Sequence, residues 1–313
     1  MRALVIGADG FAGRWLLRHL VESGDEVAAA VGPGYGDEAL PADLDPMRLD
    51  VRDADGVRRI VTSSEPDVIY YLASVSRAGA RDDLDLAIGI SVHGALNTLA
   101  AAASLDGPVR LLHVGSSHMY AIPDDATPIS EEWPIRPTTV YGAAKAAAEA
   151  ALLHLAPAAG VTLIGIRAFN HIGPGQGVGF VVPSLAAQVE SIRRADQEPV
   201  IRLGDLKVCR DFTDVRDVVR AYRLAAVETS GGTFNVASGN GITIEEILDR
   251  LLQLAGVQAR RESVPELARP ANPPAVIGDA TRLRLATGWE PEYGIDETLS
   301  DILESCGQMD DPT

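Results

Sequence analysis

Short apolar runs alternate with segments of helical periodicity along the first half of the chain. Strand-like runs cover residues 2–6, 26–31, 67–72, 109–114 and 161–167. Between them, helical patterns cover residues 11–23, 53–64 and 84–104, and a further one runs from Thr138 or Thr139 to about Ala156, before Pro157. Strands that alternate with helices in this way predict a parallel sheet covered by helices on both faces, which is a Rossmann-type doubly wound α/β domain.

The composition changes after Asn170. Glycine and proline dominate the next residues, a helix is expected over 183–195, and residues 211–225 are typical of a return to the first domain. From Thr233 onward the sequence predicts short helices and proline-rich loops. We therefore expect a dinucleotide-binding domain of residues 1–168, to which residues 208–228 return, and a smaller α/β substrate domain of residues 169–207 and 229–313.

A chain of 313 residues is long enough for two domains, and its 46% hydrophobic content is ample for a buried core. The 27 basic and 44 acidic side chains give a formal net charge of −17, which repels nucleic-acid phosphates and anionic lipid headgroups. Cys209 and Cys306 suggest neither a disulfide framework nor a metal site. With no uninterrupted apolar run of about 18 residues and no signal peptide, we expect a cytoplasmic protein without nucleic-acid, membrane or metal partners.

Three glycines stand between the first expected strand and the first expected helix. Gly7, Gly10 and Gly13 form a Gly-x-x-Gly-x-x-Gly loop. In such a loop the glycines permit a tight turn, let the backbone approach a pyrophosphate and let the helix pack closely on the strand, while the helix N-terminus supplies amide donors. The pattern alone is weak, but its position between a strand and a helix favours a dinucleotide site.

The end of the second expected strand bears on which dinucleotide binds. A carboxylate usually follows this strand and holds the ribose 2′-hydroxyl of NAD. Here glycine, proline and glycine follow Val31, and no carboxylate appears until Asp37. Because nothing there would repel a 2′-phosphate and Arg14 directly follows the glycine loop, we expect NADP(H), with NAD as the alternative. Arg14 is otherwise explained as a solvated helix residue.

Tyr141 and Lys145 lie four residues apart in the helix expected to begin near residue 139. This spacing puts the phenol and the ammonium on one helix face, where the positive charge lowers the tyrosine pKa and prepares it to exchange a proton. Such pairs also occur on ordinary amphipathic helices. Ser116, at the end of the strand expected over residues 109–114, supplies the third polar group of a catalytic set.

Together, the glycine loop, Ser116 and the Tyr141-x-x-x-Lys145 pair resemble the extended short-chain dehydrogenases/reductases that act on nucleotide sugars. The resemblance implies that Tyr141 donates a proton, that Lys145 lowers its pKa and holds the nicotinamide ribose, and that Ser116 steadies the developing oxyanion. It also implies cofactor contacts at Phe11, Asp50, Val51, Leu72 and Ala73. For Asp50, a role as a loop cap is a comparable explanation.

Three segments resemble the parts of that superfamily that meet a nucleotide diphosphate. They are residues 167–176, residues 210–217 and the Arg269-Pro270 pair. They are most similar to GDP-mannose 4,6-dehydratases and GDP-4-keto-6-deoxy-mannose reductases, and the resemblance implies substrate contacts at Ser117, Asn170, His171, Arg210 and Arg269. An arginine fork suits diphosphate oxygens, although surface salt bridges would also explain both arginines.

The residue at position 118 distinguishes between reactions within this group. In the dehydratase pattern a glutamate at this place removes the proton beside the keto carbon, whereas this chain carries His118. A histidine near neutral pH can act as the acid or base of an epimerisation, or it can hydrogen-bond a sugar hydroxyl. The absence of the glutamate makes dehydration the weaker prediction.

We therefore predict NADPH-dependent reduction of a GDP-4-keto-6-deoxyhexose at carbon 4, with Ser116, His118, Tyr141 and Lys145 as catalytic residues. The alternative is a nucleotide-sugar epimerase or 4,6-dehydratase that recycles its NAD(P) internally, and a third class is a non-catalytic cofactor sensor. The alanine-rich helices near residues 84–104 and 139–156 resemble a dimer interface of the superfamily and predict a homodimer. Packing within one chain explains the alanines equally well.

Overall fold

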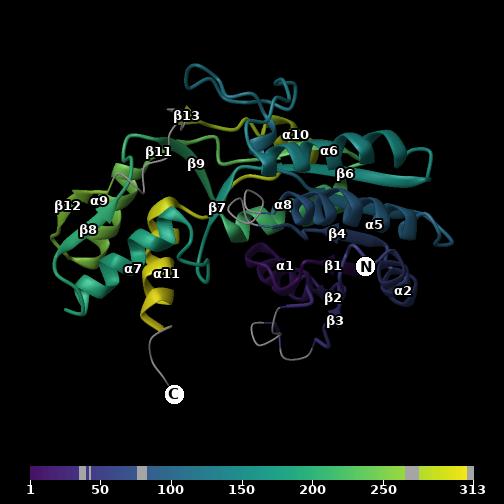
Figure 1. Ribbon diagram of the computed structural model, residues 1–313, viewed down its shortest axis with the longest axis horizontal. Helices are drawn as coiled ribbons and strands as arrows, with labels where there is room; N and C mark the ends of the chain where they lie inside the picture. Colours follow the sequence, from purple (N-terminus) through teal and green to yellow (C-terminus); the bar gives the residue numbers. More distant parts are fainter. Residues whose placement is uncertain (35–39, 42–43, 76–82, 265–274, 309–313) are drawn as a thin grey trace.

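The computed structural model describes residues 1–34, 40–41, 44–75, 83–264 and 275–308. Within them, a parallel sheet of seven strands has the order β10-β6-β5-β4-β1-β2-β3. Figure 1 labels β6, β4, β1, β2 and β3 of this sheet. Its strands are β1 (Arg2–Ile6), β2 (Glu26–Val31), β3 (Met47–Arg48), β4 (Val68–Tyr71), β5 (Val109–Val114), β6 (Val161–Ala168) and β10 (Gly232–Val236). The predicted doubly wound α/β fold is confirmed, and the strand order reverses between β1 and β4.

Helices cover both faces of the large sheet. They are α1 (Phe11–Glu22), α2 (Ala54–Ser64), α4 (Leu84–Ile88), α5 (Ala95–Ala102), α6 (Val140–Leu155), α8 (Val215–Glu228) and α10 (Thr281–Thr287). Alternate residues of β1 enter two cores: Ala3 and Val5 pack toward α1 and α8, and Leu4 and Ile6 pack toward α2, α5 and α6. Because both faces are buried, these strands are continuous apolar runs in the sequence.

The helix expected over residues 84–104 is interrupted. A π-helical turn, Gly89–Gly94, separates α4 from α5. The Tyr71 hydroxyl donates to the Ile90 carbonyl at 2.5 Å. A side chain from β4 therefore contacts the backbone inside this turn, and such long-range contacts are invisible to a local hydrophobic pattern.

The same helix, from Leu84 to Ala102, is long and apolar enough to cross a membrane by length and composition alone. The count of uninterrupted apolar residues did not indicate this, because the segment reaches a mean hydropathy of 1.3 although polar residues interrupt it. The helix packs against α2 and α6, and 44% of it is buried. A helix that covers a sheet passes the same test, so this single segment is weak evidence for a membrane span.

Smaller sheets and three helices form a second layer, drawn at the opposite end of the molecule from α2 in Figure 1. Strands β7 (Asn170–Ile172), β11 (Gly241–Thr243) and β13 (Ala275–Val276) pair with β9 (Cys209–Asp214), and β8 (Val200–Leu203) pairs with β12 (Arg260–Ser263). Helices α7 (Val181–Arg193), α9 (Ile244–Ala255) and α11 (Ile295–Gln308) enclose their own apolar core.

The chain passes between the two layers at residues that differ in part from those that the sequence indicated. Strand β9 belongs to the smaller layer, although it precedes α8, which packs on α1. Strand β10 then returns to the large sheet and pairs with β6. The division into domains at the expected residue numbers stays a prediction.

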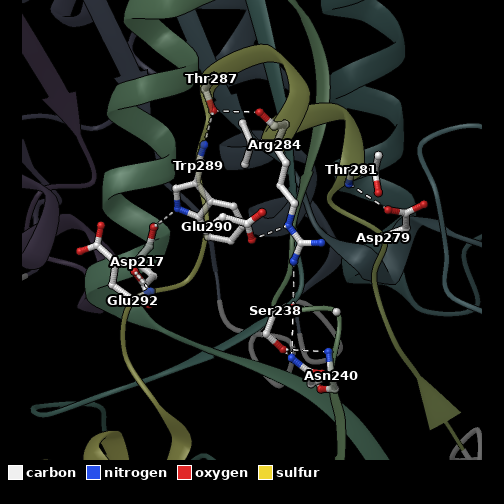
Figure 2. Close-up of polar contacts among 12 residues, drawn as sticks. Asp217, Ser238, Asn240, Asp279, Thr281, Arg284, Thr287, Trp289, Glu290 and Glu292 are labelled. Carbon is white, nitrogen blue, oxygen red and sulfur yellow. Dashed lines mark hydrogen bonds and ion pairs between the residues drawn. The ribbon is translucent and has the colours of Figure 1, made fainter.

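The segment after α10 is hydrogen-bonded to α8 (Figure 2). The buried indole of Trp289 donates from Nε1 to the Asp217 carbonyl at 3.0 Å. The Asp217 carboxylate accepts from the backbone nitrogens of Glu292 and Tyr293, each at 3.0 Å. Charge-assisted hydrogen bonds of this kind compensate a buried carboxylate. They hold the chain against the large sheet before it enters α11.

Candidate active site

The candidate site lies at the carboxyl edge of the large sheet, where β1 and β4 are neighbours. Connections leave these two strands at Gly7 and Leu72, and the Leu72 nitrogen donates to the Ile6 carbonyl at 2.9 Å. The strand order reverses here, and sheets of this kind bind ligands at the carboxyl edge where the order reverses. This is the edge at which the sequence predicted the cofactor.

The glycine loop is suited to a pyrophosphate. Gly7 has a φ of 88°, and a Cβ on Gly13 would lie 2.2 Å from the Gly7 carbonyl oxygen, so a larger residue would push α1 off the strand. Gly10 caps α1 without a side-chain hydrogen bond, and no acidic residue lies in the first helical turn. The amides and the positive end of the helix dipole therefore suit an anion, which fits the predicted dinucleotide.

Residues 171–176, predicted to meet the substrate, rest on the start of α1. The Phe11 ring stacks on the His171 ring with centroids 6.0 Å apart. Arg14 Nη2 donates to the Gly175 carbonyl at 3.1 Å, and Trp15 Nε1 donates to the Pro174 carbonyl at 3.1 Å. This loop and the predicted cofactor residues Phe11 and Arg14 thus form one surface.

The other residues predicted to contact the cofactor lie in three different settings. Arg52 donates to both carboxylate oxygens of Asp50, and this hydrogen bonding lowers the Asp50 pKa. Val51 is buried beside Gly94 of the π-helical turn. Ala73 packs against Gly7, because a Cβ added to Gly7 would lie 2.7 Å from the Ala73 nitrogen. The structure therefore brings Ala73 directly to the glycine loop.

Two helix N-caps fix the backbone positions of the predicted catalytic residues. The Thr139 Oγ1 accepts from the Gly142 nitrogen at 3.0 Å and starts α6, which orients Tyr141. The Ser116 Oγ accepts from the His118 nitrogen at 3.2 Å and starts the 3₁₀ turn Ser117–Met119. A Cβ on Gly142 would lie 2.2 Å from the His118 carbonyl oxygen, so only glycine lets the helix and the turn approach this closely.

The tyrosine hydroxyl lies between two serines. Burial raises the Tyr141 pKa, while hydrogen bonds with the Ser116 and Ser74 side chains lower it. The expected lowering by Lys145 is not among these causes. A phenol whose pKa is raised stays protonated at neutral pH, which is the form that donates a proton.

Lys145 is buried below the tyrosine on the same helix. Its Nζ donates to the Val114 carbonyl at 2.8 Å. Only 1% of its surface is exposed, and burial lowers its pKa to about 8. The ammonium is therefore close to its titration point under mildly alkaline conditions.

His118 packs against the tyrosine and is influenced by the charge of one predicted substrate arginine. Its ring meets the Tyr141 ring edge-on, with centroids 5.8 Å apart. Burial and then the positive charge of Arg210 lower the His118 pKa, so the imidazole is neutral at neutral pH. Arg210 lies on β9 beside β7, whose Asn170 donates from Nδ2 to the Asp211 carbonyl at 3.3 Å. Ser117 belongs to the same 3₁₀ turn as His118, whereas Arg269 lies outside the described residues.

Sequence reasoning missed Ser74, although its position held a signal. Ser74 follows β4, and Ser116 follows the adjacent strand β5. Because carboxyl ends of neighbouring parallel strands meet at one edge of a sheet, both hydroxyls reach Tyr141. Two serines placed equivalently after predicted strands would have indicated this pairing.

A buried polar network behind α6 was also missed. Arg167 Nε donates to Glu149 Oε1 at 3.1 Å, and Arg167 Nη1 donates to the Tyr120 hydroxyl at 3.0 Å. The Tyr120 hydroxyl donates to Asn235 Oδ1 at 2.6 Å. Glu149 follows Lys145 by four residues, so the helix face that carries the tyrosine and the lysine continues into this ion pair.

Among the residues that the structure describes, no three His, Cys, Asp or Glu side chains gather as metal ligands.

The profile of the family GDP-mannose 4,6 dehydratase matches residues 4–302. GDP-6-deoxy-D-mannose reductase of Pseudomonas aeruginosa is 33% identical over 305 residues, which are 96% of each chain.

Two solved structures are similar over nearly the whole chain. RMD from Pseudomonas aeruginosa, complexed with NADPH, is 31% identical with a TM-score of 0.86 and covers 98% of both chains. UDP-glucose 4-epimerase from Thermus thermophilus, in complex with NAD, is 27% identical with a TM-score of 0.86 and covers 98% of this chain and 99% of that one.

Proposed function

We propose that this chain, which belongs to the GDP-mannose 4,6-dehydratase family of NAD(P)-dependent nucleotide-sugar enzymes, reduces the 4-keto group of a GDP-linked 4-keto-6-deoxyhexose. The observation that carries the proposal is the meeting of Ser116, Tyr141 and Lys145 at the carboxyl end of β5, where Lys145 Nζ donates to the Val114 carbonyl and the Tyr141 ring contacts the turn that Ser116 caps. The similarity to a GDP-6-deoxy-D-mannose reductase supports this choice of substrate. The absence of a glutamate at position 118 argues against dehydration.

The chain's own residues would handle the proton and the charge of this reaction. A nicotinamide cofactor, when bound, supplies the hydride. Tyr141 donates its proton to the ketone oxygen, and Ser116 hydrogen-bonds the same oxygen as charge develops. Lys145 keeps a positive charge below the phenol and holds the nicotinamide ribose. Arg210, Asn170, His171, Ser117 and Arg269 are the proposed substrate contacts.

For the cofactor, the proposed contacts are Gly7, Gly10, Phe11, Gly13, Arg14, Asp50, Val51, Leu72 and Ala73, besides Tyr141 and Lys145. The sequence favours NADPH, with NAD as the alternative; the related RMD structure is complexed with NADPH, and the related UDP-glucose 4-epimerase structure is complexed with NAD. A homodimer and a cytoplasmic location remain predictions from the sequence.

The test is to incubate the purified chain with GDP-4-keto-6-deoxy-mannose and NADPH or NADH, in separate reactions, and to follow the absorbance of the reduced cofactor. We expect stoichiometric loss of the cofactor and formation of a GDP-6-deoxyhexose. Tyr141→Phe should lower the rate by roughly 10²–10⁴-fold while the cofactor still binds. A Tyr141→Phe variant with near-normal hydride transfer would refute the mechanism.

A second candidate is a nucleotide-sugar epimerase with an internal redox cycle. The neutral His118 ring against Tyr141 favours it, because such an imidazole can exchange a proton with a sugar carbon. An enzyme of this kind would show no net change in the cofactor, and it would release bound NAD(P) on denaturation. His118→Asn would then abolish the exchange of ring hydrogens with heavy water, whereas a simple reductase has no such exchange to lose.

A further inference from the structure

One carboxylate of the glycine loop reaches the end of β2. Asp9 lies between Gly7 and Gly10, and its Oδ1 accepts a hydrogen bond from the Gly32 nitrogen at 3.3 Å. Gly32 is the first residue after β2. The glycine loop is hydrogen-bonded to β2, because the backbone nitrogens of Gly7 and Ala8 both donate to the Ala30 carbonyl, at 3.0 and 3.1 Å. The position of the Asp9 carboxylate is therefore fixed by the backbone on both sides.

This position is the one that decides between the two dinucleotides. In dinucleotide-binding sheets an acidic residue at the end of the second strand accepts a hydrogen bond from the ribose 2′-hydroxyl of NAD, while an arginine accommodates the 2′-phosphate of NADP. The sequence shows no carboxylate between Val31 and Asp37, which was the reason to expect NADPH. The structure supplies a carboxylate at that place from another segment of the chain.

The arginine expected to hold a 2′-phosphate is directed elsewhere. Arg14 Nη2 donates to the Gly175 carbonyl, and so its guanidinium lies against the loop of residues 173–176. A phosphate monoester carries a charge of about −1.5 to −2 at pH 7. Beside the Asp9 carboxylate, such a group would meet a like charge at short range.

We propose that Asp9 accepts a hydrogen bond from the adenosine 2′-hydroxyl and selects NADH over NADPH. The inference rests on the proposed function only in requiring that the chain binds a nicotinamide dinucleotide. It adds a residue that determines which reduced cofactor the site takes. It replaces the sequence-based preference for NADPH, whose premise was the lack of a carboxylate after β2.

The experiment measures cofactor binding to the purified full chain without any sugar substrate. NADH and NADPH are titrated separately, with the fluorescence of the reduced nicotinamide as the signal. We expect NADH to bind about tenfold or more tightly than NADPH, because a like-charge contact is costly in a partly buried site. Asp9→Asn keeps an acceptor for the Gly32 nitrogen but removes the charge, and it should reduce the ratio of the two Kd values by about tenfold.

Asp106→Asn is the matched control, since Asp106 is an exposed carboxylate just before β5, at the opposite edge of the sheet. It should leave the ratio unchanged. A ratio that is the same in Asp9→Asn and in the unaltered chain would overturn the role of Asp9 while leaving the proposed reduction intact. Failure of both cofactors to bind would overturn this inference and the proposed function together.

Discussion

Replacing His113 by phenylalanine is expected to make folding less sensitive to acid between pH 7 and pH 5. His113 lies on β5 with 1% of its surface exposed, and its ring stacks on Tyr71 with centroids 6.0 Å apart. Among the described residues, neither ring nitrogen has a hydrogen-bond partner. Burial, followed by the charge of Lys145, lowers the His113 pKa from 6.5 to about 3. The imidazole is therefore neutral in the folded chain.

The sign and size of the effect follow from linkage. The unfolded chain binds a proton at His113 as the pH falls through about 6.5, while the folded chain does not until about pH 3. The stability that His113 contributes is thus fully present above pH 6.5 and is lost progressively as the pH falls. One pKa unit corresponds to about 1.4 kcal/mol, so the loss between pH 7 and pH 5 is about 2 kcal/mol.

The assay compares thermal unfolding of the unaltered chain, of His113→Phe and of His93→Phe at pH 7 and pH 5. The fall in Tm on acidification should be smaller in His113→Phe by roughly 4 °C, at about 2 °C per kcal/mol for a chain of this size. His93 is exposed, so its replacement should leave the fall unchanged. An equal fall in all three proteins would refute the reasoning that His113 folds as a buried neutral base.

Two further predictions concern α6. Glu149→Gln should lower the free energy of unfolding, measured in urea, by about 3–5 kcal/mol, because it leaves the Arg167 guanidinium buried without its countercharge. The control is Glu304→Gln, which changes an exposed carboxylate of α11. An equal effect of both substitutions would contradict the role of the ion pair. The Lys145 ammonium has a pKa of about 8, so kcat/KM should be maintained below pH 8 and decline above it. Lys145→Arg should move that decline to higher pH, and an unshifted profile would show that another group titrates.

The sequence predicted the strands of the large sheet well because both of their faces are buried. The bounds of β1, β2 and β5 agree with the expected runs, and the glycine loop lies where it was expected. Apolar continuity and a tight turn are local properties, so they can be recognised without tertiary information.

The features that sequence reasoning missed depend on partners distant in the chain. Strand β10 is recognisable only through its pairing with β6, and the π-helical turn contacts Tyr71 on another strand. Asp9 and Ser74 come to the site because neighbouring parallel strands end together. In each case tertiary packing decided the outcome, and only for Ser74 did the position after a predicted strand hold a local signal.

The passage of the chain back and forth between its two sheets restricts how such a protein can be divided or recombined. Strand β10 shields the edge of β6, and α8 covers the apolar face of α1, yet both are encoded after β7 of the smaller layer. A continuous fragment that ends after β6 would expose an unpaired strand edge and an apolar surface, both of which promote aggregation. The large sheet therefore needs residues from both halves of the sequence, and a single cut in the gene cannot separate it from the smaller layer.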